Sequence, residues 1–190
     1  MIHTRRELIE YIKHDAAAQP RKKIRPALFG DYTWKFQLLM RKLDYYDTKR
    51  KNNAFFLPLY LYYRYRYSSL GLKLGFSIPY NIFGKGLCIV HRGTIVINSQ
   101  SKIGENCRLH TCVNIGASKG SSAPVIGNNV YIGPGTKIVG AVTIADGVCL
   151  GAGTVVVKSI TEENTTWAGV PSRKISDNSS HDMLSSHLFD

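Results

Sequence analysis

The chain has 190 residues, 44% hydrophobic and 20% charged, which is enough apolar material for one domain of ordinary size, with or without an appended segment. No stretch approaches the ~20 consecutive apolar residues of a membrane-spanning helix, and the first residues lack the apolar run of a secretion signal, so we expect a cytoplasmic protein. The net charge of +12 is uneven: residues 1–76 carry 16 Lys and Arg against 6 Asp and Glu, a net +10, whereas residues 77–190 carry 9 against 7, a net +2.

Three helices are predicted in the basic first part of the chain. The capping-box pattern TRRE precedes a short helix of about 4–17, which ends before Pro20. A second helix covers YTWKFQLLMRKLDYYDTKRKN, and a third begins near Pro58 and is expected to end at Gly71. The third helix interleaves tyrosines and arginines over 62–67. We expect these to pack on the following domain, although Tyr and Arg together also suit sugars, nucleic acid or a membrane interface.

A six-residue repeat organises the chain from about residue 97 onward. Its first positions are aliphatic and its second positions are mostly small. The first-position residues are Ile97, Ile103, Leu109, Ile115, Ile126, Ile132, Ile138, Ile144, Leu150 and Val156. An amphipathic helix needs apolar residues three and four apart, and a simple hairpin needs strict alternation. A period of six is instead typical of short strands stacked as the coils of a parallel β-helix, with three hexads in each triangular coil.

The repeat is interrupted twice. The segment SKGSSAP, at 118–124, shortens the spacing between its flanking isoleucines to eleven and is predicted to project from the coil as a loop. Upstream, Ile89 and Ile97 are eight apart, and the two extra residues surround His91 in VHRGT. Because packing does not explain a titratable side chain where the repeat is interrupted, His91 is a candidate functional residue. From the residues alone, His91 can be either a catalytic base or a structural histidine.

These features together resemble a known family. The hexads, with GKGLCIVHRGTIVIN, IGENCRLHTCVNIGAS and TTWAGVPSRKI, are similar to the hexapeptide-repeat acyltransferases, in particular serine O-acetyltransferases and polysaccharide-biosynthesis O-acetyltransferases. The resemblance implies a mainly β fold, a left-handed parallel β-helix, a homotrimer, and acetyl-CoA as co-substrate. We therefore expect an N-terminal helical segment at 1–75, a β-helix acetyltransferase domain at 76–176 and a tail at 177–190. The tail is expected to be mobile up to MLSSHLF, which is expected to dock on a partner subunit.

The resemblance assigns His91 the role of general base toward an acceptor hydroxyl that attacks the thioester directly. Serine enzymes pair this base with an upstream aspartate, and they have an aspartate just before it and a second histidine after the loop. The matching places here are Ser77, Val90 and Ala123. Because serine needs a charged partner for its ammonium, these departures favour a hydroxyl of a sugar or glycan precursor. Serine O-acetyltransferase of cysteine biosynthesis is the alternative, and a non-catalytic trimeric scaffold or binding module is the second.

The resemblance also implies where coenzyme A would bind. Its pantetheine arm would follow two small-residue corners of the coils, and its phosphates would meet bases near the end of the repeat. These residues are Gly133, Pro134, Gly135, Gly151, Ala152, Gly153, Lys158, Arg173 and Lys174. Alternatively, the glycines only turn corners of the coils and the basic side chains are solvated.

The remaining polar candidates are few. His110 follows the inward Leu109, so it is expected to point outward, at the surface or an interface, or to line the acceptor site with Ser77. We expect no metal, because the coils contain only two histidines, His91 and His110, and the four cysteines fit no metal pattern. Nucleic acid is not expected as a partner, and peripheral membrane contact through the basic first part stays open.

Overall fold

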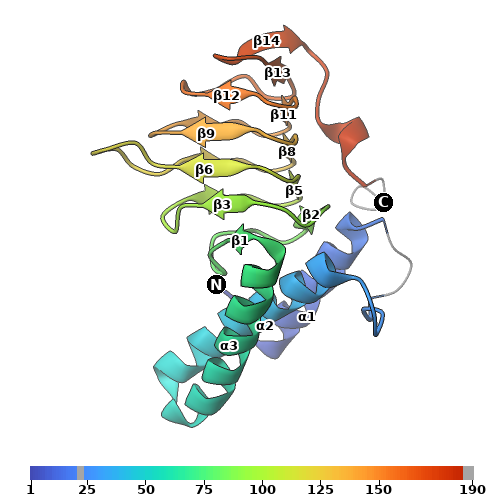
Figure 1. Ribbon diagram of the computed structural model, residues 1–190, viewed down its shortest axis with the longest axis vertical. Helices are drawn as coiled ribbons and strands as arrows, with labels where there is room; N and C mark the ends of the chain where they lie inside the picture. The colour runs from blue at the N-terminus through green and yellow to red at the C-terminus, as the bar shows by residue number, and fades with distance from the viewer. Residues whose placement is uncertain (21–23, 186–190) are drawn as a thin grey trace.

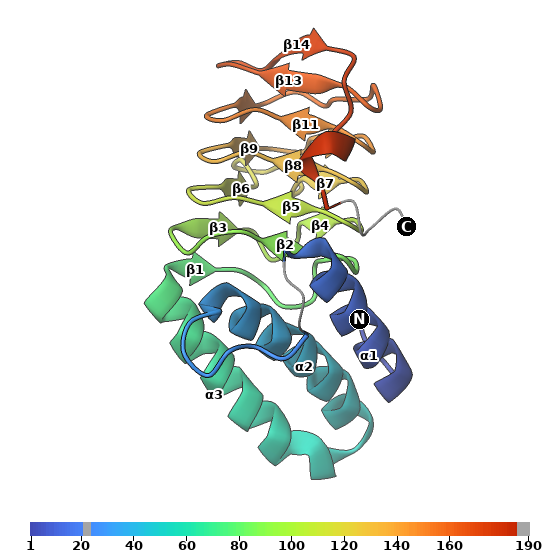
Figure 2. The same cartoon turned by 90° about the vertical axis from the view of Figure 1, so that its right-hand side faces the viewer.

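The computed structural model describes residues 1–20 and 24–185 and shows three helices beneath a tapering stack of β-coils (Figures 1 and 2). The helices are α1 (Arg5–Ala18), α2 (Tyr32–Asn52) and α3 (Leu57–Leu74), the last preceded by the 3-10 turn η1 (Ala54–Phe56). The Thr4 side chain accepts a 3.1 Å hydrogen bond from the Glu7 amide at the start of α1, as the capping pattern predicts. α2 covers the predicted segment in full.

The end of α3 differs from the prediction. Gly71 lies inside the helix, where an added Cβ would come within 3.2 Å of the Phe36 ring of α2 and 3.3 Å of the Phe76 carbonyl. Gly75 ends the helix instead, with a left-handed φ of 78° that favours glycine. The prediction that Gly71 ends the helix is therefore wrong: that glycine allows two elements to pack closely.

Short strands form the three faces of the β-helix. Sheet A contains β1 (Phe76–Ser77), β3 (Ile95–Ile97), β6 (Asn114–Gly116), β9 (Lys137–Val139) and β12 (Val155–Val156). Sheet B contains β4 (Lys102–Ile103), β7 (Val125–Ile126) and β10 (Thr143–Ile144). Sheet C contains β2 (Cys88–Ile89), β5 (Arg108–Leu109), β8 (Tyr131–Ile132), β11 (Cys149–Leu150), β13 (Thr166–Ala168) and β14 (Arg173–Ser176). All pairs are parallel except β13 with β14.

The repeat sets the register of these sheets. Leu109 pairs with Ile132, and Ile132 with Leu150, so first-position residues of successive coils stack in the interior, where each is at most 1% exposed. This arrangement confirms the predicted parallel β-helix and fits the expected left-handed coil. The segment between β6 and β7 projects from the side of the stack, as predicted from 118–124 (Figure 1).

A buried ion pair joins the helices to the first coil. The Asp15 carboxylate of α1 accepts hydrogen bonds from Arg41 of α2 at 2.8 and 3.0 Å, and from the backbone amides of Gly86 and Leu87 at 2.9 and 3.0 Å. Arg41 also donates to the carbonyl of Gly84 at 2.6 Å. Because both side chains are almost fully buried, the helices and the coils form one continuous interior at this point.

The tail packs on the coils of its own chain. Ser180 is fully buried, and its amide donates to the Gly147 carbonyl at 2.9 Å. Leu184 follows the 3-10 turn η2 (His181–Met183) and is also buried. The prediction of a mobile tail is therefore wrong for 177–185, because buried polar and apolar groups fix it to the coils. The rest of MLSSHLF lies outside the described residues.

Within the described residues, no helix is both long enough and apolar enough to cross a membrane.

Candidate active site

His91 lies in the turn after β2, where the first coil passes from sheet C to sheet A. The ring is exposed, and the two residues that break the repeat belong to this turn. The Gly93 amide donates to the Leu74 carbonyl at 3.1 Å, so the end of α3 supports the turn from below. Gly93 has a φ of 137°, and an added Cβ would come within 2.1 Å of Thr111 Oγ1. Position 93, in the turn that carries His91, therefore requires glycine.

His110 faces His91 from the next coil. Their ring centroids are 6.1 Å apart at an interplanar angle of 63°, and Tyr131 packs against His110 from above at 5.2 Å. Burial, followed by the nearby charges of Arg108 and His91, lowers the pKa of His110, which favours the neutral form of this ring. Its Nε2 is buried and has no hydrogen-bond partner among the described residues. A buried polar atom without a partner is uncommon in proteins, and this one lies beside an exposed histidine.

The same corner recurs on every higher coil and forms a continuous edge. Above the two histidines, this glycine edge comprises Gly133, Pro134, Gly135, Gly151, Ala152, Gly153, Ala168 and Gly169. Backbone hydrogen bonds join successive corners. The Gly135 amide donates to the Thr111 carbonyl at 2.9 Å, and the Gly153 amide donates to the Pro134 carbonyl at 2.8 Å. Adjacent strands lie about 4.8 Å apart, so four coil steps carry the edge roughly 19 Å above His91. Figure 2 shows the stacked sheet C strands that feed this edge.

A small cavity lies near the upper end of the glycine edge. It measures about 270 Å³ and is lined by Val157, Lys158, Pro171, Ser172 and Arg173. The structure therefore brings together two of the three bases predicted to meet the coenzyme phosphates.

Lys174 is held elsewhere. Its Nζ lies 2.5 Å from Glu162 and 2.6 Å from Asp177, and it does not line the cavity.

Ser77 does not join the two histidines. It lies on β1 beside Val96 of β3, and no hydrogen bond links it to His91 in the described structure. It lines a separate groove of about 660 Å³ between α3 and the base of sheet A. Its neighbour Phe76 is buried and offers no carboxylate either.

The other two departures bring no carboxylate to the corner either. Val90 is half-buried beside His91, and Ala123 is buried at the end of the projecting loop. The carboxylates of residues 76–176 all lie in turns that precede sheet C strands, at the opposite ends of those strands from His91. They are Glu105, Asp146, Glu162 and Glu163. Among residues 76–176, no acidic side chain therefore lies at the strand ends that carry His91.

The described residues contain no group of three His, Cys, Asp or Glu side chains that could hold a metal ion. All four cysteines are free, and burial raises the pKa of Cys88 to about 11 and that of Cys107 to about 12. Thiolate chemistry at these two positions is therefore disfavoured at neutral pH.

Sequence reasoning missed Tyr131 and Thr111. The signal that could have found Tyr131 is the repeat itself, because residues just before the first positions of β5 and β8 must stack on the outer face of sheet C. Thr111 follows His110 into the corner, where its carbonyl binds the coil above. Both contribute to how the two histidines are held.

Comparisons with known proteins agree with this geometry. The bacterial transferase hexapeptide family, described as six repeats, matches residues 123–158. The matched residues are those of the coils from β7 to β12. The chain is 35% identical over 66 residues to a serine acetyltransferase of Helicobacter pylori, an alignment that covers 33% of this chain and 39% of that enzyme. It is 33% identical over 95 residues to a serine acetyltransferase of Synechococcus elongatus, covering 48% and 38%. The chain thus spans less than half the length of these curated relatives.

Solved structures share most of its architecture. Soybean serine acetyltransferase superposes with a TM-score of 0.71 at 26% identity, covering 88% of this chain and 69% of that one. A serine acetyltransferase of Brucella abortus in complex with coenzyme A gives a TM-score of 0.65 at 27% identity, covering 90% and 67%. The helices therefore belong to the shared fold together with the coils.

Proposed function

We propose that this protein is an acetyl-CoA-dependent O-acetyltransferase in which His91 is the general base. The observation that carries this proposal is the edge that has His91 and His110 at one end and the Lys158–Arg173 cavity near the other. A coenzyme with a long amide-bearing arm and a phosphate-bearing end matches an edge of glycine corners followed by two bases. The similarity to serine acetyltransferases supports the same chemistry.

The reaction is a direct transfer. His91 takes the proton of the acceptor hydroxyl as its oxygen attacks the thioester carbonyl, the carbon–sulfur bond breaks, and the proton passes to the departing thiolate. Backbone amides of the corner stabilise the oxyanion that forms at the carbonyl. His110, whose ring centroid lies 6.1 Å from that of His91, borders the place where the acceptor hydroxyl would lie.

Serine is the acceptor that the comparisons favour. The curated relatives and the superposed soybean structure are serine acetyltransferases. We therefore propose serine O-acetylation as the first candidate activity, with a homotrimer as the assembly that the family resemblance implies.

A hydroxyl of a sugar or glycan precursor is the second candidate. A specific observation favours it: the carboxylates of residues 76–176 all lie at the opposite ends of the sheet C strands from His91, and Ser77, Val90 and Ala123 carry no charge that could pair with the ammonium of serine. A neutral hydroxyl needs no such partner.

Coenzyme release distinguishes these activities. The purified protein is incubated with acetyl-CoA and either serine or a panel of sugars and sugar nucleotides, and free thiol is followed over time. Turnover with serine alone supports the first candidate, and turnover with a sugar alone supports the second. Absence of both turnover and coenzyme binding would refute the proposal and favour a non-catalytic scaffold.

A further inference from the structure

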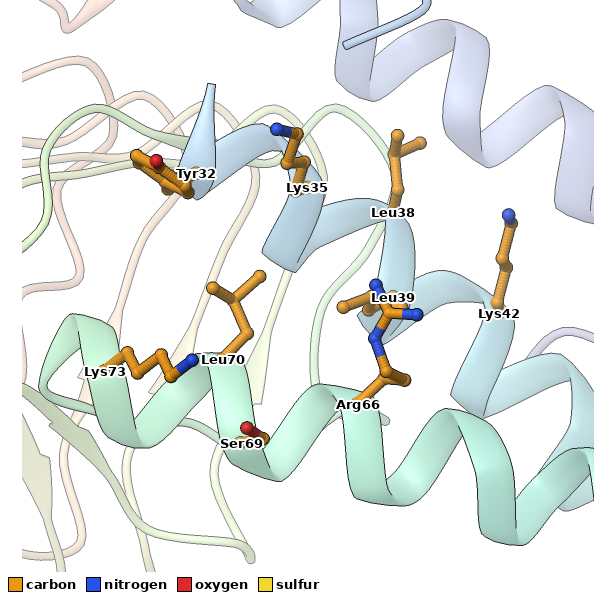
Figure 3. A pocket seen from close by; sticks show the side chains of 9 residues that line it. All are labelled: Tyr32, Lys35, Leu38, Leu39, Lys42, Arg66, Ser69, Leu70 and Lys73. Atoms are coloured by element: carbon orange, nitrogen blue, oxygen red, sulfur yellow. The ribbon is translucent and has the colours of Figure 1, made fainter. Parts of the chain in front are cut away.

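A groove between α2 and α3 lies apart from the candidate active site. This cationic groove has a volume of about 410 Å³. Its lining residues are Tyr32, Lys35, Leu38, Leu39, Lys42, Arg66, Ser69, Leu70 and Lys73. Figure 3 shows the cations on both helices, with the guanidinium of Arg66 rising from α3 toward Leu39 of α2. The groove therefore presents positive charge from two sides around leucine side chains.

The positive charge of the groove is not neutralised by the described residues. No Asp or Glu lines it, and the sequence of α3 contains neither residue. Lys35 donates to the Leu28 carbonyl and Arg66 to the Tyr62 hydroxyl, both at 2.8 Å and both neutral acceptors. Within residues 1–20 and 24–185, neither Lys42 nor Lys73 forms an ion pair. Four clustered cations without counter-charge attract an anionic partner.

An apolar ridge runs along α3 on the face next to its groove-lining residues, and Leu72 of this ridge also lines the separate groove beside Ser77. Leu61, Tyr65 and Leu72 are four and seven residues apart, so they lie on one face of the helix, and they are 54%, 71% and 84% exposed. The basic part of the chain carries thirteen of the nineteen exposed large hydrophobic side chains found in the described residues. Exposed leucine and tyrosine beside uncompensated Lys and Arg match the composition of surfaces that lie in a membrane interface.

We infer that the cationic groove and the apolar ridge dock the protein on a bilayer that contains anionic phospholipid. The headgroup phosphates lie over Lys35, Lys42, Arg66 and Lys73. The ridge enters the boundary between headgroups and acyl chains, where burial of leucine and tyrosine adds to the electrostatic attraction.

Other occupants use only part of this surface. A nucleic acid or a free phosphate would engage the cations but leave Leu61 and Leu72 in water. A second copy of the chain would cover the ridge, but pairing one groove with another would place cations against cations. A bilayer with anionic headgroups satisfies both the charge and the apolar ridge.

The full-length protein is tested by flotation with vesicles of phosphatidylcholine alone and of phosphatidylcholine mixed with phosphatidylglycerol. We expect binding to the mixed vesicles only, weakening as salt is added. The double variant Lys42→Gln with Lys73→Gln should bind about thirtyfold more weakly, since each cation near such a surface contributes about a factor of five. The matched control is Lys13→Gln with Lys102→Gln, which removes the same charge from exposed positions elsewhere and should bind as the unaltered protein does.

The apolar ridge is tested by Leu61→Ser with Tyr65→Ser, which should weaken vesicle binding without changing its salt dependence. Circular dichroism and sedimentation of each variant establish that its fold and assembly are unchanged. The inference is overturned if mixed vesicles do not bind, or if the matched control loses as much affinity as the groove variant. It is also overturned if the ridge variant changes the assembly, because the face would then be covered by a second copy of the chain. A loss of binding to duplex DNA, but not to vesicles, in the groove variant would overturn it as well.

Discussion

Replacing Asp15 with alanine should destabilise the protein more than most single substitutions. The carboxylate accepts hydrogen bonds from Arg41 and from the amides of Gly86 and Leu87, and it is fully buried. Asp15→Ala leaves the guanidinium buried without its counter-charge and leaves two amides unpaired. Breaking one side of such a buried pair costs about 4 kcal/mol, a large share of the roughly 5–15 kcal/mol that stabilises a domain.

Urea unfolding at fixed protein concentration, followed by far-ultraviolet circular dichroism, measures this loss. The matched control is Glu10→Ala, which removes a carboxylate of the same helix whose ion pair with Lys85 is partly exposed and should change stability little. The double variant with Arg41→Met should lose less than the sum of the two single changes, since no unpaired charge remains. Equal losses for Asp15→Ala and Glu10→Ala would refute the reasoning.

Three further predictions concern the site. Gly93→Ala should lower the unfolding midpoint clearly, because its Cβ would collide with the coil above, whereas Gly153→Ala, with nothing within 4 Å, should lower it less; equal shifts would contradict this. Arg173→Gln should raise the KM for acetyl-CoA about tenfold at unchanged kcat, whereas Lys174→Gln, whose lysine is held by carboxylates, should not. The pKa of His110 is lowered in the folded state, so the unfolded state binds the proton first as the pH falls. The free energy of unfolding should therefore decrease below about pH 6.5. Melting curves at several pH values should show a smaller decrease for His110→Phe.

The coil interior was predictable because its register follows from a periodic pattern. Leu109, Ile132 and Leu150 stack as the spacing requires, and the interruption around His91 marks the corner where the two histidines meet. The outward direction of His110 followed from the same register. These predictions succeed because each depends on residues close together in sequence or at a fixed repeat.

What the sequence did not reveal depends on contacts between distant segments. A glycine near the end of a predicted helix usually marks the helix end, but Gly71 is needed because Phe36, thirty-five positions earlier, packs against it. The polar tail has the composition of a mobile segment, but Ser180 is buried against a coil. Ser77 was predicted at the place of the orienting aspartate, yet it lies on sheet A, where it pairs with Val96. No local pattern contains these tertiary contacts.

The role of His91 as general base is the central claim, and single-turnover coenzyme release by His91→Ala tests it most directly. The assay uses the acceptor that the unaltered protein acetylates fastest, with equilibrium binding of acetyl-CoA measured alongside. We expect the rate to fall by at least about a hundredfold while coenzyme affinity and the unfolding midpoint stay unchanged. His14→Ala, on the remote helix α1, serves as the control and should keep full activity. Turnover of His91→Ala at the rate of the unaltered protein would contradict the account.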